Sequence, residues 1–146
     1  MAHTTGSAAK IATLVEGGKV REGPSEPGEW KSDDPAAQLR ELSVRLQHAL
    51  AGADLDATRP SPDGEVPLRQ ALAFPICRLA VHIWDVYRSQ HRVFELPAGL
   101  LGFCRQAAEW VPEDKLRRPG GFGPAQLVPE DATPTTRLMA YFGRSV

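Results

Sequence analysis

The most reactive side chains of this sequence lie in an apolar stretch. Residues 77–91 read CRLAVHIWDVYRSQH, with His82 and Asp85 among aliphatic and aromatic neighbours. Burying an imidazole and a carboxylate costs free energy unless both groups are satisfied. A spacing of three places them on one helix face, where Asp85 can orient the imidazole of His82 for acid–base chemistry. The alternative is a histidine at the edge of the core, with Asp85 in a structural ion pair to an arginine such as Arg88.

Composition limits the kinds of protein in which these residues can act. The chain has 146 residues, 42% of them hydrophobic and 24% charged, which suits one soluble globular domain over residues 1–146. A formal net charge of −1 gives no electrostatic reason to expect a nucleic acid or an anionic membrane as partner. No apolar run reaches the ~18 residues of a membrane span, and the N-terminus lacks a signal pattern. We therefore expect a cytoplasmic protein in which Cys77 and Cys104 are free, buried thiols.

Apolar periodicity predicts an all-α fold. Apolar residues recur at helical spacing in five segments, which cover about residues 7–16, 34–52, 67–90 and 98–111 and the residues after 134. Pro75 falls inside the third segment and predicts a kink or break near Phe74. Glycine and proline dominate the stretches between helices, so loops are expected at 19–33, 53–65 and 117–134. No strand is expected.

Three residues outside the apolar stripes have a structural role of their own in this prediction. Asp34 precedes Pro35 and is expected to cap the second helix, since its carboxylate can accept from free backbone amides there. Trp30 is expected to pin the first loop onto the body of the protein, and Phe122 the last loop.

Several of these segments resemble one known family. VHIWDVYRSQ at 81–90 and PGGFGPAQLVPEDATPTTRLMAYFGR at 119–144 are similar to the C-terminal part of the mycothiol-dependent maleylpyruvate isomerase family, within the DinB-like superfamily. DPAAQLRELSVRLQHAL resembles its third bundle helix, and AHTTGSAAKIATLVEGG the second half of its second helix. The resemblance implies a DinB-like four-helix bundle with a Pro/Gly-rich loop and a short C-terminal helix. The bundle is expected to be truncated at its N-terminus, because the chain begins two residues before His3.

The resemblance also implies a metal site, and the sequence departs from it at one residue. The family holds its metal with a histidine on the second helix and with a Glu and a His four residues apart on the fourth. The matching positions are His3, Arg78 and His82. A guanidinium cannot ligate a cation and stays protonated at ordinary pH. We therefore expect no cofactor; the alternative is zinc or another divalent metal with mycothiol, held by His3 and His82.

Three functions remain open on these grounds. In the first, a degenerate and metal-free relative binds or transforms a small molecule near His82, with His82 and Asp85 as catalytic residues and Arg78 and Trp84 as substrate-binding residues. Arg78 would hold an anionic group; alternatively, Arg78 is exposed or pairs with Asp85, and Trp84 belongs to the core. The second is a working metal-dependent thiol transferase or isomerase. The third is a non-catalytic dimerisation or regulatory module.

A homodimer is the expected assembly. Without the family's first helix, the bundle would expose an apolar seam, and burial of such a seam is worth about 25 cal/mol per Å². A second copy related by a two-fold axis could cover it. The alternatives are that the N-terminal segment repositions to cover the seam, or that the chain is a fragment.

Overall fold

The computed structural model describes residues 2–20, 27–62, 64–117 and 119–146. Of these residues, 58% are helical and 6% lie in strands, so the expectation of a helical protein is confirmed at this level. Each helix in the described ranges is too short or too polar to pass through a lipid bilayer. The chain divides into two compact units, Met1–Val86 and Tyr87–Val146, which are described separately.

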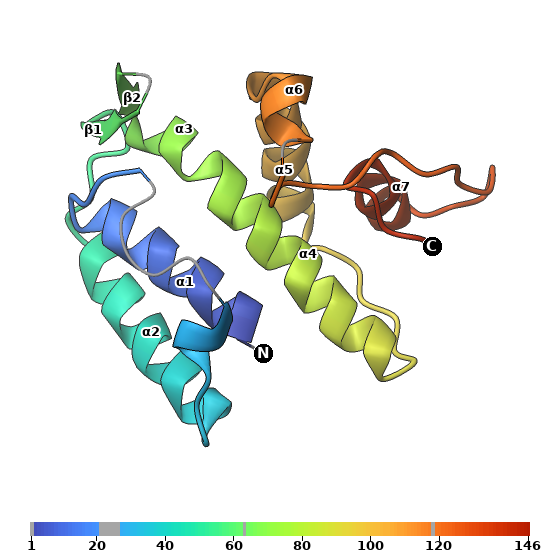
Figure 1. Ribbon diagram of the computed structural model, residues 1–146, viewed down its shortest axis with the longest axis horizontal. Helices are drawn as coiled ribbons and strands as arrows, with labels where there is room; N and C mark the ends of the chain where they lie inside the picture. The colour runs from blue at the N-terminus through green and yellow to red at the C-terminus, as the bar shows by residue number, and fades with distance from the viewer. Residues whose placement is uncertain (1, 21–26, 63, 118) are drawn as a thin grey trace. The chain divides into compact units, whose positions relative to one another are not determined.

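Four helices, one 3₁₀ turn and a β-hairpin make up the first unit (Figure 1). In chain order the elements are α1 (Ala2–Val15), η1 (Pro27–Trp30), α2 (Pro35–Leu50), β1 (Thr58–Ser61), β2 (Gly64–Pro67), α3 (Leu68–Ala71) and α4 (Ala73–Ser89). Helix α1 lies between α2 and α4 in this view, and it contacts α2, η1 and α3. Helix α4 continues into the second unit by its last turn.

Helix α1 begins five residues before the predicted start and ends where the glycines predict. Gly17 adopts a left-handed φ of 101°, and the amide of Gly18 donates to the carbonyl of Thr13 at 2.8 Å. This is the glycine-terminated pattern that satisfies the last carbonyls of a helix. The earlier start brings His3 into the first turn of the helix, because the helix includes residues from Ala2 onward.

Side-chain hydrogen bonds are found at both ends of α2. The carboxylate of Asp34 accepts from the amide of Ala37 at 2.9 Å, so the predicted cap is confirmed. Towards the other end, Arg45 makes two hydrogen bonds to Glu16, one of them from Nε to Oε1 at 2.7 Å. This hydrogen bonding lowers the pKa of Glu16 below its ordinary value. The pair joins the C-terminal end of α1 to α2.

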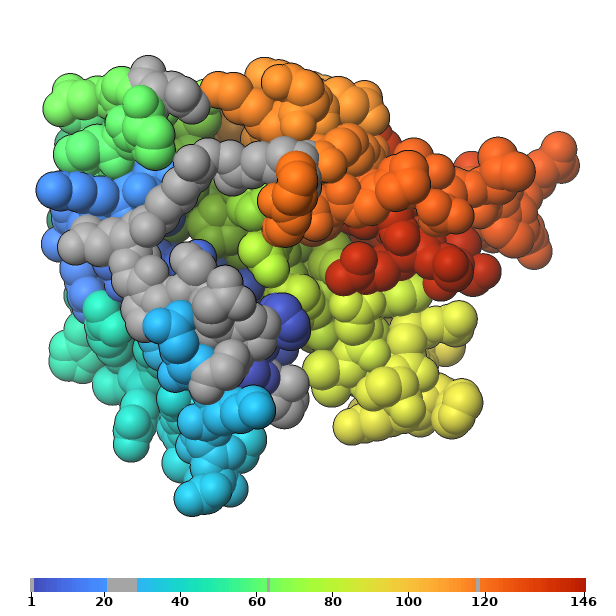
Figure 2. All heavy atoms as spheres, in the orientation of Figure 1, coloured from blue at the N-terminus to red at the C-terminus, as the bar shows by residue number. Residues whose placement is uncertain are grey.

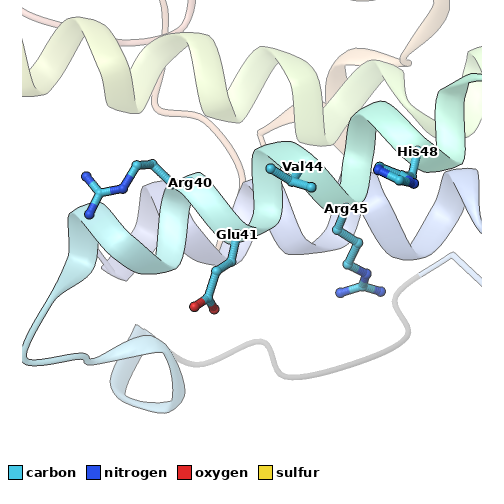
Figure 3. Close-up of a pocket in the computed structure, with 5 residues that line it drawn as sticks. All are labelled: Arg40, Glu41, Val44, Arg45 and His48. Carbon is cyan, nitrogen blue, oxygen red and sulfur yellow. The ribbon is translucent and has the colours of Figure 1, made fainter.

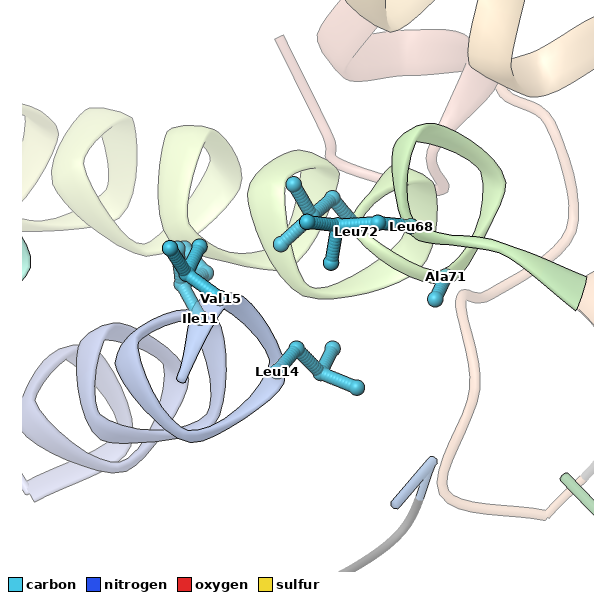
Figure 4. Close-up of a cluster of buried hydrophobic side chains, with 6 residues drawn as sticks. All are labelled: Ile11, Leu14, Val15, Leu68, Ala71 and Leu72. Carbon is cyan, nitrogen blue, oxygen red and sulfur yellow. The ribbon is translucent and has the colours of Figure 1, made fainter. Parts of the chain in front are cut away.

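The apolar core of the first unit lies where α1 meets α3 (Figure 4). Six buried side chains form it: Ile11, Leu14, Val15, Leu68, Ala71 and Leu72. The break predicted near Phe74 is found two residues earlier, at Leu72, between α3 and α4. Because Pro75 has no amide hydrogen, it cannot donate to the carbonyl of Ala71, four residues back.

A β-hairpin replaces part of the loop expected at 53–65, so the expectation of no strand is wrong. Thr58 pairs with Pro67 and Ser61 with Gly64 in an antiparallel register. The strands are four residues long, contain prolines and lack apolar alternation, which removes the signal on which strand prediction relies. Arg59 anchors the hairpin, since its guanidinium donates to the carbonyls of Leu14 at 2.7 Å and Val15 at 3.3 Å.

The loop aromatic Trp30 packs on α1, as predicted. A Cβ added to Gly6 would lie 2.9 Å from Cδ1 of Trp30, so the indole rests directly on the glycine. Trp30 closes η1, the 3₁₀ turn that precedes α2. The part of the 19–33 loop from 21 to 26 lies outside the described residues.

In the second unit, two of the three helices follow the prediction: α5 (Ala98–Trp110) and α7 (Pro134–Tyr141). The third helix, α6 (Glu113–Leu116), was not predicted; it is a single turn that follows Pro112. Cys104 here and Cys77 in the first unit are buried and form no disulfide, as expected.

No regular element is found in the described residues between α6 and α7, as the prolines and glycines predict. Phe122 is buried and stacks on Phe142, with ring centroids 4.3 Å apart. Arg117 fixes the loop by donating to the carbonyls of Gly123 and Tyr141. Beyond it the segment extends away from the rest of its unit, and Leu127 is 98% exposed (Figure 2).

We predict that Gly143→Ala destabilises the second unit by several kcal/mol. Gly143 has a φ of 82°, and a Cβ there would lie 2.6 Å from Cα of Gly123. The substitution combines left-handed strain of about 1–2 kcal/mol with a backbone overlap. Gly120→Ala is the matched control, because its φ is 77° and no atom lies within 4 Å of the added Cβ. Thermal unfolding followed by circular dichroism measures both, and equal losses would contradict the packing described.

Candidate functional site

Two histidines from different helices lie side by side in the first unit. The rings of His3 on α1 and His82 on α4 have centroids 5.1 Å apart and are tilted by 33°. At the other end of the same pair of elements, Leu14 and Val15 pack on Leu72. These two contact points make α1 and the α3–α4 segment run antiparallel. The residues between them therefore face one another along a seam, which we call the α1–α4 seam.

The two ring nitrogens of His82 have different surroundings. Its side chain is 15% exposed, and Nδ1 lies 3.8 Å from Oδ2 of Asp85. That distance is beyond hydrogen-bond range, so Asp85 acts on the ring as a neighbouring charge. Nε2 of His82 is buried and has no hydrogen-bond partner. A buried imidazole nitrogen without a partner costs free energy, and a bound group could satisfy it.

Arg78 lies one turn before His82 on the same helix. Its guanidinium carbon is 5.8 Å from the centroid of the Phe74 ring, within cation–π range, and the side chain is half-buried. Burial lowers the pKa of His3, and the positive charges of His82 and Arg78 lower it further. Arg78 is therefore close enough to His3 to disfavour its protonated form.

Sequence reasoning missed Lys10, a fourth basic residue of the seam. Lys10 is half-buried on α1, and burial lowers its pKa below the ordinary value. The charge of Arg78 lowers that pKa as well, whereas Glu29 raises it. His3 and Lys10 differ by seven residues, which is two helical turns, so both lie on the same side of α1. The shared side could not be recognised from the sequence, because the predicted helix began at residue 7 and did not include His3.

Trp84 lies on another side of α4 from His82. Two residues of helix separate their side chains by about 160° around the axis. Trp84 is buried at 7% exposure, in one stripe with Cys77 and Ala80. This position suits the core role that the sequence left open for Trp84. The same geometry keeps the buried thiol of Cys77 away from the histidine pair.

The donor set of the seam does not fit the metal site that the family resemblance implies. His3 and His82 supply two imidazoles, whereas catalytic zinc sites use three protein ligands. No group of three or more His, Cys, Asp or Glu residues with metal-binding geometry occurs in the described part of the chain. The position four residues before His82 holds a guanidinium, whose fixed charge opposes a divalent cation. No step of the chemistry below is therefore assigned to a metal.

A separate hollow lies on the outer face of α2 (Figure 3). Its lining consists of Arg40, Glu41, Val44, Arg45 and His48. All five residues come from one helix, with Val44 between charged and polar neighbours. The hollow is wide open and has no facing element among its lining residues, so it does not assemble groups for catalysis.

Comparison with known proteins leaves the family resemblance as a prediction. No protein-family model matches the chain, and neither the curated proteins nor the solved structures gave a significant match.

We predict that Arg78→Glu creates a zinc site that the natural chain lacks. The change adds an anionic ligand four residues before His82, on the same helix face, and removes the opposing charge. Zinc affinity should rise by on the order of 100-fold, as measured by competition with a chromogenic chelator.

Two controls define this experiment. Arg88→Glu, on the exposed last turn of the same helix, should leave zinc affinity unchanged, and adding His82→Ala to Arg78→Glu should abolish the gain. One equivalent of tightly bound zinc in the natural chain, lost in His82→Ala, would contradict the analysis of the donor set.

Proposed function

We propose that this protein binds a small anionic molecule in the α1–α4 seam and transfers a proton to or from it through His82. In this proposal it is a cytoplasmic, metal-free relative of the mycothiol-dependent maleylpyruvate isomerase family. The observation that carries the proposal is the position of Arg78: a fixed positive charge helps to lower the pKa of His3 and stands where the family pattern has an anionic ligand. A site with this charge favours an anion over a cation.

Four basic residues lie along the seam. His3, Lys10, Arg78 and His82 all contribute to it, and the pKa values of His3 and Lys10 are both lowered by burial and by the charge of Arg78. A lowered pKa means that the surroundings of His3 and Lys10 disfavour their protonated, positively charged forms. An anion bound beside Arg78 would reverse this penalty, so its binding energy would come partly from relieved repulsion.

His82 has the geometry of an acid–base group in this proposal. Its buried Nε2 is the ring nitrogen without a partner, and its Nδ1 is the one nearer to Asp85. When Nε2 takes a proton from the bound molecule, the ring becomes positively charged, and the carboxylate of Asp85 at 3.8 Å stabilises that charge. Asp85 is therefore a positioning residue.

The two other functions make different demands on the same residues. A metal-dependent thiol transferase needs a third ligand beside His3 and His82. In a non-catalytic module the polar groups would satisfy one another, and Nε2 of His82 would have a hydrogen-bond partner. The orphaned nitrogen is the observation that favours a ligand-binding site over the module.

We predict that inorganic phosphate, used as a probe anion, binds the natural chain and that Arg78→Gln weakens this binding at least about tenfold. The measurement is an NMR titration that follows the backbone amides of residues 2–10 and 76–86. Arg105→Gln is the matched control, since Arg105 is an exposed helical arginine of the second unit. Equal affinity in the natural chain and in Arg78→Gln would contradict the proposal, as would no binding at all.

The homodimer also remains a proposal, and α2 offers a face for it. Large apolar side chains stay about half exposed in this part of the unit: Val44 (55%), Leu50 (48%) and Leu55 (46%). Charges of both signs flank Val44, as a self-complementary two-fold contact requires. Light scattering at micromolar concentration should give twice the mass of one chain, and Val44→Glu should halve it. Val93→Glu, at an 83% exposed position of the second unit, is the control, and a monomeric natural chain would exclude the dimer.

A further inference from the structure

The outer face of α2 presents a row of three side chains at helical spacing. Arg40, Val44 and His48 are four residues apart and follow one another along the helix (Figure 3). Glu41 and Arg45 lie beside this row, and all five residues line the open hollow on this face. Val44 is 55% exposed. An apolar side chain therefore lies in water at the centre of a charged and polar surface.

Helical geometry divides the neighbours of Val44 between two sides. At about 100° per residue, Glu41 and His48 point about 40–60° to one side of Val44. Arg40 and Gln47 point about 40–60° to the other side. Along the helix axis, each side holds one residue about 4.5 Å from Val44 and one about 6 Å from it in the opposite direction. The face is thus nearly symmetric in position about Val44, with an acidic and a basic residue on one side.

We propose that α2 packs against α2 of a second copy in an antiparallel two-fold contact centred on Val44, with Glu41 of each copy against the partner's His48. This inference rests on the homodimer of the proposed function and deepens it. The two-fold axis runs between the helices, perpendicular to them, so a residue before Val44 meets the residue on the same side after it in the partner. Glu41 then lies within about 1.5 Å of the level of the partner's His48. Arg40 meets the partner's Gln47 in the same way, and each contact occurs twice.

The side chains of this contact suit one another. A neutral imidazole donates a hydrogen bond to a carboxylate, and a protonated one adds an attractive charge. Glu41 and His48 are exposed, and their side chains make no hydrogen bond or ion pair within the part of the chain that the structure describes. They can therefore turn to a partner without breaking a contact of their own. Arg45 differs, because it is paired with Glu16 of its own chain.

The alternative two-fold contact has its axis along α2 and packs the two helices parallel. Glu41 would then meet the partner's Arg40, but the two copies of Arg40 would lie at one level, as would the two copies of Glu41 and of His48. In the antiparallel contact each of these like pairs is about 9–12 Å apart along the axis. The antiparallel contact also opposes the two helix macrodipoles, which the parallel contact aligns. Both differences favour the antiparallel contact.

Charge exchange tests the contact in solution. Glu41→Lys should raise the dissociation constant of the dimer at least about fivefold, and so should His48→Glu, because each places like charges opposite one another. Glu41→Lys and His48→Glu in one chain should restore most of the natural affinity, since the pairs are re-formed with exchanged signs. Analytical ultracentrifugation at pH 7 measures the constants. Glu109→Lys, at an exposed position of α5, is the matched control and should change nothing.

Disulfide crosslinking tests the direction of the helices. A mixture of Glu41→Cys and His48→Cys chains should form a mixed disulfide under mild oxidation, as read by mass spectrometry. Either variant alone should stay uncrosslinked, because its two copies are about 9–12 Å apart along the axis, which a disulfide cannot span. In the parallel contact each variant alone would crosslink. The natural chain gives the background, since Cys77 and Cys104 are buried.

The outcomes separate this inference from the homodimer itself. If the natural chain is a dimer but the exchanged charges do not restore its affinity, or if each cysteine variant crosslinks alone, the antiparallel contact is overturned and the homodimer stands. If the natural chain is a monomer, the homodimer and the contact both fail. The anion site does not depend on any of these outcomes.

Discussion

Arg78 carries a charge that no ordinary pH removes, and the seam between α1 and α4 has to accommodate it. The guanidinium is half-buried, lies over the Phe74 ring and acts on the protonation of both His3 and Lys10. A divalent cation would add to this positive charge, whereas an anion offsets it. In the proposed function, the charge of this one residue is therefore the reason to expect an anionic ligand.

Helix α1 makes this arrangement possible. Its C-terminal half is fixed by the apolar cluster with α3, by Arg59 on its last carbonyls and by the Glu16–Arg45 pair to α2. Its first turn is then held at the level of His82, so that the histidines meet although 79 positions separate them in the chain. The substrate side of the proposed site is thus formed by two helices whose register is set about 15–20 Å away, at their apolar ends.

Helical periodicity was enough to predict most elements of the fold, because apolar stripes and caps are local signals. Asp34 as a cap, the glycine stop at Gly17 and the break before Pro75 all follow from the chemistry of one or two residues. The hairpin at 58–67 was not predictable in this way. Its strands are held by backbone pairing and by Arg59 rather than by an apolar face, and the hydrogen bond of Arg59 to Leu14 joins residues 45 positions apart.

The candidate site was predictable on α4 and only partly on α1. His82, Arg78 and Asp85 share one helix, so their spacing alone relates them. On α1, His3 enters the helix only because α1 begins at Ala2, and it meets His82 only because α1 runs antiparallel to α4, which is tertiary information.

A phosphate titration that follows the Nε–H signal of Arg78 and the imidazole signals of His82 tests the central claim most directly. The account predicts that both sets of signals move together and give one dissociation constant. Signals of Arg78 and His82 that stay fixed at saturating phosphate, or that move only when zinc is added to the natural chain, would contradict it.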